Sequence, residues 1–339
     1  MLPESAYFQL TPDLKICRIL NGLWQLSGGH GFNPNIKQAV PDMFAYHDSG
    51  LTTWDLADHY GPAESFIGQF RHDLAEQRGE AALSQMQAFT KWVPRPGTMS
   101  RSVVEAAIDV SRRRMGMPTL DLLQFHWWDY ADTRYLDALD RLTDLQLAGQ
   151  IRHLALTNFD TEHTHRIVEH GTQIVSNQVQ FSLIDRRPEV AMIPFGQEHN
   201  ITLLTYGTLC GGLLTDRYLA QPEPGYSQLN TASLRKYKQM IDLWGGWTLF
   251  QELLRALRSI ADKHQVAIAN VAVRYILDKP QVAGVIAGVR LGIAEHRADN
   301  VKAFDFALDS SDLGTIHAVT ARSQDLFKRI GDCGDEYRG

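Results

Sequence analysis

The chain has 339 residues, of which 44% are hydrophobic and 21% charged, and its formal net charge is −6 at pH 7. This composition is ordinary for a globular protein, and the length suits two average domains or one α/β barrel. The acidic balance and the lack of a dense basic stretch argue against nucleic acid as a partner, because phosphate binding needs concentrated lysine and arginine.

Cys17, Cys210 and Cys333 lie far apart in the sequence, and none belongs to a CxxC pair. They indicate a reducing compartment and no structural zinc, and no other metal site is predicted. The first ten residues lack the pattern of a signal peptide, and no apolar run reaches the roughly 18 residues that span a bilayer. We therefore expect a cytoplasmic protein with no membrane partner; the sequence sets no expectation for its oligomeric state.

Short apolar segments alternate with longer helical patterns along the whole chain. Eight strands are expected, at residues 16–24, 51–55, 86–91, 120–126, 151–157, 174–178, 201–206 and 282–289. The start of the first belongs either to that strand or to an N-terminal hairpin with residues 7–10. Helices are expected between the strands, at residues 37–48, 64–76, 101–115, 134–147, 161–169, 189–198 and 250–264 with 270–277.

Local signals support these elements, since Ser102 with Glu105 fits a capping box and Gly116 is placed to end the same helix. Alternation of strand and helix repeated eight times predicts a single domain over residues 1–339, a (β/α)8 TIM barrel. The competing doubly wound sheet usually carries a GxGxxG turn, which is missing here. Residues 215–246 are expected to form a long loop, either a lid or a surface excursion. Residues 330–339 predict no particular structure.

In such barrels, catalytic groups lie where the strands end. These positions hold Asp55, with Tyr60 five residues later, then Lys91 and His126. Singly, each has a structural explanation as a helix cap, a packed ring, a surface charge or a core imidazole. Together, at successive strand ends, they indicate one site.

The four residue types suit proton transfer at an oxygen. Tyrosine, with a pKa of about 10, is a poor acid-base catalyst at neutral pH. A lysine beside the phenol lowers its pKa, and a carboxylate keeps that lysine charged. A neutral histidine donates a hydrogen bond to a carbonyl oxygen. None of the four residues is a nucleophile poised to form a covalent intermediate with the substrate. A reaction at this site therefore requires a hydride from a cofactor.

With these motifs, the chain resembles the aldo-keto reductases over nearly its whole length. The stretch TTWDLADHYG carries Asp55 and Tyr60, FTKW carries Lys91, and LLQFHWW carries His126; the resemblance implies that these four form the catalytic tetrad. It also implies that Thr157 and Asn158 in LALTNF, and Gln178 in SNQVQ, hold the nicotinamide amide. Tyr206 in LLTYGTLCGG is implied to stack on the nicotinamide ring.

The rest of the cofactor site is expected near the loops after the seventh and eighth strands. The candidates there are Gly207, Thr208, Leu209, Gly288, Val289 and Arg290, and the family resemblance adds His296 and Asn300. Gly22, Trp24 and Asp55, at the ends of the first two strands, complete the predicted cofactor set. The stretch from Gly288 to Asn300 is longer than in the family pattern, and His296 replaces the more usual glutamine or arginine. If Arg290 grips a 2′-phosphate, the cofactor is NADPH; if it is a surface residue, NADH is equally suitable.

Tryptophans near the strand ends predict an aromatic substrate pocket made by Trp24, Trp92 and Trp127, although neighbours in a strand alternate faces. The leading prediction is an enzyme that reduces an aldehyde or ketone, including a sugar, with NAD(P)H. The alternatives are an NAD(P)+-linked aldose or alcohol dehydrogenase and a non-enzymatic nicotinamide-binding regulatory subunit. A hydrolase or lyase is disfavoured, because the strand ends lack paired acids and a histidine-rich metal set.

Overall fold

The computed structural model describes residues 2–31, 35–95 and 97–338, and its centre is a closed parallel barrel with strand order β10-β3-β4-β5-β6-β7-β8-β9. This confirms the predicted (β/α)8 fold. The strands are β3 (Ile19–Gly22), β4 (Thr53–Asp55), β5 (Gln87–Trp92), β6 (Leu120–His126), β7 (Ile151–Thr157), β8 (Ser176–Gln180), β9 (Thr202–Tyr206) and β10 (Val282–Gly288).

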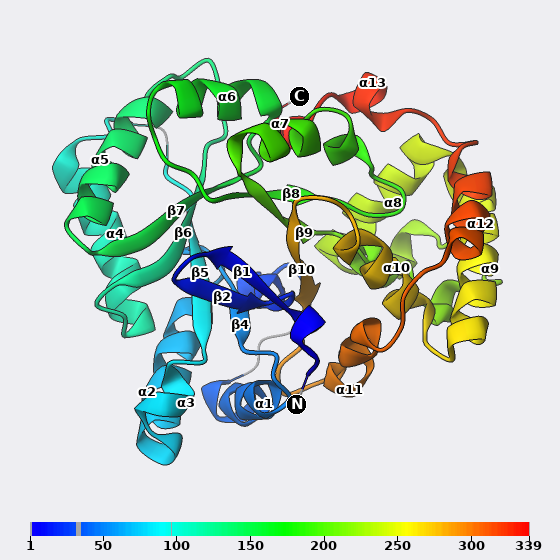
Figure 1. Cartoon of the computed structure of the whole chain (residues 1–339), viewed down its shortest axis with the longest axis horizontal. Helices are drawn as coiled ribbons and strands as arrows, with labels where there is room; N and C mark the ends of the chain where they lie inside the picture. The colour runs from blue at the N-terminus through cyan, green and yellow to red at the C-terminus, as the bar shows by residue number, and fades with distance from the viewer. Residues whose placement is uncertain (1, 32–34, 96, 339) are drawn as a thin grey trace.

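An antiparallel hairpin of β1 (Tyr7–Thr11) and β2 (Leu14–Cys17) closes the end of the barrel where the strands begin. Leu14 and Ile16 share a buried cluster with Leu20 and Phe89 inside the barrel. Figure 1 looks onto this hairpin, which crosses the centre of the ring of helices. The start of the predicted strand 16–24 therefore belongs to the hairpin, and Trp24 begins a 3-10 turn beyond β3.

Helices surround the barrel, and no helix of the described residues is long and apolar enough to cross a membrane. The predicted helix 101–115 is observed with these bounds, and Gly116 ends it in the left-handed conformation at φ 60°. Ser102 lies inside that helix, so the predicted capping box is wrong. The helices are α1 (Ile36–Asp48), α2 (Ala63–Arg78), α3 (Glu80–Leu83), α4 (Arg101–Met115), α5 (Tyr135–Leu147), α6 (Thr161–Glu169), α7 (Met192–His199), α8 (Ala232–Trp244), α9 (Gly246–His264), α10 (Ile268–Leu277), α11 (Arg297–Asn300), α12 (Ser310–Thr320) and α13 (Leu326–Ile330).

The expectation of a loop through residues 215–246 is wrong for the second half, which forms α8. Thr231 caps this helix by accepting a hydrogen bond from the Leu234 amide. Tyr237 and Trp244 lie on the buried face of α8, because both side chains are in the core. Tyr237 packs on Gly207 after β9, which has φ +74°, and a Cβ on Gly207 would lie 2.6 Å from the Tyr237 hydroxyl.

The side chains inside the barrel change from apolar to polar along β5 and β6. Phe89 and Leu122 belong to the apolar cluster above the hairpin. Because alternate residues of a strand face the same side, the next inward positions are Lys91 on β5 and Gln124 on β6, followed by His126. The strand ends therefore form a polar rim above an apolar plug.

Candidate active site

Lys91 and Asp55 form a buried ion pair at the rim. The Lys91 ammonium donates to Asp55 Oδ2 at 2.6 Å and to the Leu56 carbonyl at 3.0 Å. Burial lowers the pKa of Lys91, and the Asp55 carboxylate opposes that shift. Paired in this way, the lysine keeps its charge without contact with bulk water.

Two amides complete the surroundings of Asp55. Gln124 and Gln178 both donate to Asp55 Oδ1 at 2.8 Å, and Gln178 also donates to Gln124 Oε1 at 2.6 Å. The Gln178 amide nitrogen is thus engaged inside the barrel. Gln124 was not predicted, although its position two residues before His126 places it on the same face of β6.

Tyr60 lies beside this pair and is partly exposed at the rim. The Lys91 ammonium is 5.3 Å from the centroid of its ring. Burial, together with Asp55, Tyr337 and Asp58, raises the pKa of Tyr60 well above its usual value. This differs from the expected lowering, because burial and the nearby Asp55 and Asp58 carboxylates disfavour the phenolate. Tyr60 is therefore protonated at neutral pH, which suits a proton donor.

His126 presents an imidazole without hydrogen-bond partners. Both ring nitrogens are buried and unpaired within the described structure, as is Oγ1 of Thr157, the residue opposite His126 in β7. Burial, with Arg338, His59 and Lys91 nearby, lowers the pKa of His126 to about 3. The ring is neutral at physiological pH and keeps an N–H group to donate. Unpaired buried polar atoms are rare, so these two side chains fit a bound polar ligand.

Asn158 and Tyr206 lie next to Thr157, at the ends of β7 and β9. Asn158 adopts the left-handed conformation at φ 57°, and its backbone N–H donates to the backbone carbonyl of Gln178 at 2.9 Å. The Tyr206 hydroxyl donates to Asn158 Oδ1 at 2.7 Å. This arrangement offers an amide-binding edge beside an aromatic ring, so the residues present fit a nicotinamide.

The candidates for the phosphate end of the cofactor lie around β3, β9 and β10. A Cβ on Gly22 would lie 2.7 Å from the Ile286 side chain, and the Val289 amide donates to the Gly22 carbonyl. Thr208 donates from its hydroxyl to the Phe181 carbonyl. The side chains of Val289 and Thr208 are thus buried in the fold, while Leu209 is partly buried.

Gly288 is exposed, and a Cβ there would lie 2.1 Å from Gln25 Nε2, which identifies Gln25 as a neighbour that was not predicted. Arg290 is exposed and forms a bridge with Ala294. The following chain runs along α1, where the Gly292 amide donates to Asp42 and the Arg297 guanidinium lies 5.6 Å from the Tyr46 ring.

Two cofactor candidates, His296 and Asn300, flank this outer segment. His296 is exposed, and Asn300 ends the short helix α11, whose Asp299 carbonyl accepts a hydrogen bond from Asn270 on α10. The described hydrogen bonds join neither residue to the catalytic candidates. The structure therefore places both in the helical layer rather than with the rim residues.

The tryptophans divide between the core and the rim. Trp92 and Trp127 follow the inward-facing Lys91 and His126, so they point outward; their exposed fractions are 5% and 3%, and both pack on Phe125. This position does not support their predicted role in substrate binding. Trp128 is 46% exposed and lies with its ring 4.3 Å from that of His126.

Trp24 is partly exposed and meets His30 edge to face at 4.7 Å. It therefore stays, with Trp128, as a candidate for the substrate pocket. Trp128 could have been found from the sequence, because it stands two residues after His126 and so returns to the same side of an extended chain.

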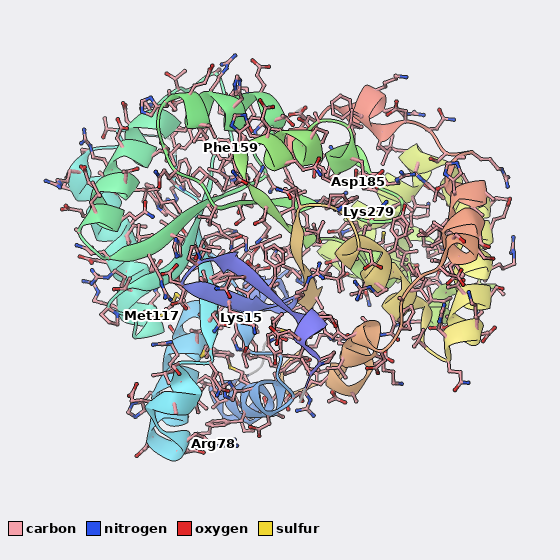
Figure 2. The ribbon with its side chains drawn as sticks, viewed as in Figure 1. Lys15, Arg78, Met117, Phe159, Asp185 and Lys279 are labelled. Carbon is pink, nitrogen blue, oxygen red and sulfur yellow. The ribbon has the colours of Figure 1, made fainter. Side chains whose placement is uncertain are left out.

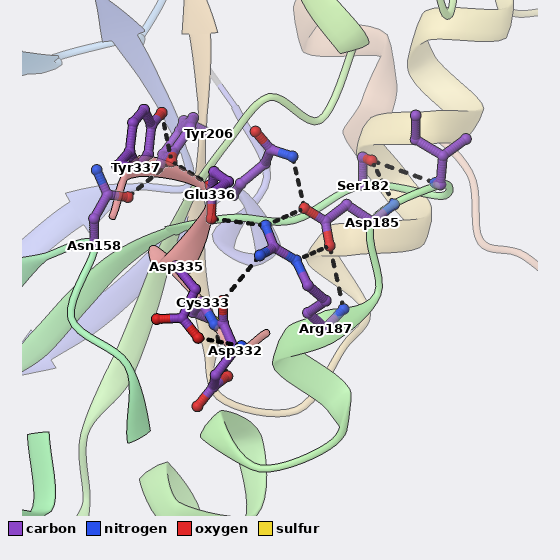
Figure 3. Close-up of polar contacts among 12 residues, drawn as sticks. Asn158, Ser182, Asp185, Arg187, Tyr206, Asp332, Cys333, Asp335, Glu336 and Tyr337 are labelled. Carbon is purple, nitrogen blue, oxygen red and sulfur yellow. Dashed lines mark hydrogen bonds and ion pairs between the residues drawn. The ribbon is translucent and has the colours of Figure 1, made fainter. Parts of the chain in front are cut away.

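The C-terminal tail reaches the rim, which no sequence pattern indicated. Glu336 lies 3.0 Å from the buried Arg187 guanidinium, and the Tyr337 hydroxyl is 3.1 Å from that of Tyr206 (Figure 3). Arg338 donates to the Trp127 carbonyl at 2.7 Å. Residues 332–338, called the tail below, thus contribute side chains to the site.

A groove of about 1000 Å³ lies elsewhere, beside the hairpin and α1. Its lining includes Tyr7, Lys15, His47 and Gln87; Lys15 is labelled on the hairpin in Figure 2. Because these residues surround the end where the strands begin, the groove is separate from the rim that carries catalytic groups in barrels of this type.

A closed parallel barrel with a tyrosine, a lysine–aspartate pair and a histidine at one rim has the features of an oxidoreductase. The chain belongs to the aldo/keto reductase family, whose model matches residues 18–321. It is an enzyme of the oxidoreductase class.

Curated relatives of the chain include two reductases of Escherichia coli K12. The NADH-specific methylglyoxal reductase is 22% identical over 89% of this chain and 94% of its own length. The L-glyceraldehyde 3-phosphate reductase is 25% identical over 86% of this chain and 85% of its own. Among solved structures, a glycerol dehydrogenase of Gluconobacter oxydans shares 22% identity and a TM-score of 0.77, over 94% of this chain and 96% of its own. This last likeness shows the fold.

Proposed function

We propose that the protein reduces a small aldehyde or ketone to an alcohol with NAD(P)H, and that Tyr60 donates the proton. One observation carries the proposal: a protonated tyrosine, a buried Lys91–Asp55 pair and a neutral, unpaired His126 meet at one rim of the barrel. The fold brings these groups together from three neighbouring strands and a loop.

The cofactor, when bound, supplies a hydride to the carbonyl carbon. Thr157, Asn158 and Tyr206 are proposed to hold the nicotinamide, and Gln178 to position Asp55 from below. His126 donates its N–H to the substrate oxygen and orients it. Tyr60 then gives its proton to that oxygen, while Lys91 stabilises the phenolate that remains.

Arg290 favours NADPH, since an exposed guanidinium beside the Gly288 turn suits a 2′-phosphate. The NADH-specific relative supports NADH as the second candidate. A fluorescence titration decides between them, because Trp24 and Trp128 lie near the site and their emission should respond to the cofactor. Tight binding of NADPH with weaker NADH supports the role of Arg290, and binding of neither contradicts the proposal.

The names of the relatives support small oxygen-rich substrates, since they refer to methylglyoxal, L-glyceraldehyde 3-phosphate and glycerol. The glycerol dehydrogenase also supports alcohol oxidation as the reverse direction at the same site. A regulatory subunit would bind nicotinamide without turnover.

The deciding measurement is the rate of cofactor oxidation with a panel of aldehydes, for the wild type and Tyr60→Phe. We expect the rate to fall by about 100-fold or more in the variant, with cofactor affinity within about twofold of the wild type. The exposed Tyr226→Phe is the matched control. Equal rates in wild type and Tyr60→Phe would remove Tyr60 as the donor.

A further inference from the structure

We propose that Tyr337, held by Lys236, is a specificity-determining residue that binds a second oxygen of the substrate, next to the reacting carbonyl. The preferred substrates are then small 2-hydroxy or 2-oxo carbonyl compounds rather than simple aldehydes. This inference rests on the proposed function, because it adds a substrate contact to the same site.

Tyr337 bridges opposite sides of the rim. Its ring lies 6.0 Å from that of Trp128, which follows His126 at the end of β6, in an edge-to-face arrangement. Its hydroxyl lies 3.1 Å from that of Tyr206 at the end of β9. Tyr337 is also among the groups that raise the pKa of Tyr60. The phenol therefore stands over the space between the proton donor and the proposed nicotinamide residues.

Lys236 on α8 orients the hydroxyl group of Tyr337. The Lys236 ammonium donates to the Tyr337 hydroxyl, and it lies 4.2 Å from the Tyr337 ring centroid and 5.1 Å from that of Tyr206. A hydroxyl that accepts from an ammonium has its own proton available to donate. Because the Tyr206 hydroxyl donates to Asn158, its oxygen can accept the Tyr337 proton. A substrate oxygen at the rim is a suitable acceptor for that proton.

A buried ion pair holds the tail in place, so Tyr337 is fixed more firmly than a residue at an ordinary chain end. Arg187 exposes 1% of its side chain, pairs with Asp185 at 2.8 Å and Glu336 at 3.0 Å, and donates to the Asp332 carbonyl. Figure 3 shows this guanidinium between Asp185 on one side and the tail on the other. Moving the tail away would break this pair and leave an uncompensated buried charge, so the observed position of the tail is strongly favoured.

The residue after Tyr337 adds a second anchor. The Arg338 guanidinium lies 3.9 Å from the ring centroid of Tyr130, which also stacks in parallel on His163 at 3.5 Å. Arg338 also donates to the Trp127 carbonyl. With anchors at Glu336 and Arg338, the backbone of Tyr337 is held on both sides.

The test compares two aldehydes of equal carbon number, propanal and 2-hydroxypropanal, in the full-length wild type and in Tyr337→Phe. Loss of one neutral hydrogen bond should reduce kcat/KM for 2-hydroxypropanal by about fivefold, chiefly through KM. The value for propanal should stay within about twofold. Lys236→Met should change the ratio of the two values in the same direction, and Tyr226→Phe should leave it unchanged.

The ratio separates a substrate contact from a merely structural role. A tail that only supports the fold predicts equal losses for both aldehydes, and this result, or no change for either, overturns the inference while leaving the proposed function intact. A wild type that oxidises neither NADPH nor NADH with any carbonyl overturns the proposed function, and the inference with it.

Discussion

The Lys91 ammonium lies 2.6 Å from the Asp55 carboxylate in a position where the two side chains expose only 4% and 3% of their surface. Removing one partner of such a pair leaves a buried charge unpaired, which costs about 3–5 kcal/mol. Asp55→Asn should therefore lower the free energy of unfolding by that amount, and the double variant Asp55→Asn/Lys91→Met should recover part of the loss. Urea denaturation of the wild type, Asp55→Asn, Lys91→Met and the double variant measures this coupling.

The surface pair Arg322–Glu252, whose side chains expose 57% and 31%, is the control for that cycle. Exposed pairs contribute at most about 1 kcal/mol. If Asp55→Asn cost no more than Glu252→Gln, the buried pair would lack the structural role assigned to it.

His126 predicts a pH dependence of stability. Its pKa is lowered to about 3 by burial and by Arg338, His59 and Lys91, whereas an unfolded histidine has a pKa of about 6.5. Between these values the unfolded chain binds a proton that the folded chain does not, so stability falls as pH falls below about 6.5 and is unaffected by this group above it.

The corresponding measurement is the unfolding free energy of wild type and His126→Asn at pH 7 and pH 5. Relative to the variant, the wild type should lose about 2 kcal/mol over this interval, because a proton bound only by the unfolded state contributes about 1.4 kcal/mol per pH unit below 6.5. Parallel pH curves for the two proteins would mean that His126 takes up a proton in the folded state.

Arg290 predicts cofactor preference. If its guanidinium binds the 2′-phosphate, Arg290→Ala should weaken NADPH by about tenfold or more, in line with a charge-assisted contact of about 1.5–3 kcal/mol, and leave NADH unchanged. Dissociation constants from fluorescence titration test this, with the exposed Arg141→Ala on α5 as control. A similar loss for both cofactors would assign Arg290 a structural role.

The neighbouring tryptophans predict opposite effects. Trp127→Ala should destabilise the protein by about 3–5 kcal/mol, since it empties a core position. Trp128→Ala should change stability by less than about 1 kcal/mol and instead raise KM, because this ring is half exposed beside His126. Thermal unfolding and steady-state kinetics on both variants separate the two roles, and a large stability loss in Trp128→Ala would contradict the assignment.

The sequence predicted the barrel well because its signals are local. The bounds of β6, β7, α4 and α6 were predicted correctly. The two strands have short apolar runs and α4 has apolar residues at helical spacing. The residues at the ends of β4, β5 and β6 were predicted to lie together, because the strand ends of a barrel meet at one rim. The alternation of faces, applied strictly, also predicts that Trp92 and Trp127 point outward and that Gln124 points inward.

The remaining features depend on contacts that no local pattern contains. The segment that forms α8 was predicted to be a loop, because the sequence does not show which surface its aromatic residues pack against. In the structure, Tyr237 packs on Gly207. The tail is more extreme, since Tyr337 meets Tyr206 across 131 residues of chain. The raised pKa of Tyr60 likewise depends on burial and on Asp55, Tyr337 and Asp58, which only the fold brings near it.

The position of the tail also affects how the substrate preference of this site can evolve. The groups proposed to carry out the chemistry, Asp55, Tyr60, Lys91 and His126, come from three neighbouring barrel strands and the loop after the first of them. Trp128, Lys236 and Tyr337, which we propose to determine substrate preference, come from the loop after β6, from α8 and from the tail. Substitutions in the second set can accumulate without disturbing the first, so new substrate preferences are accessible to selection or design while the catalytic rim stays intact.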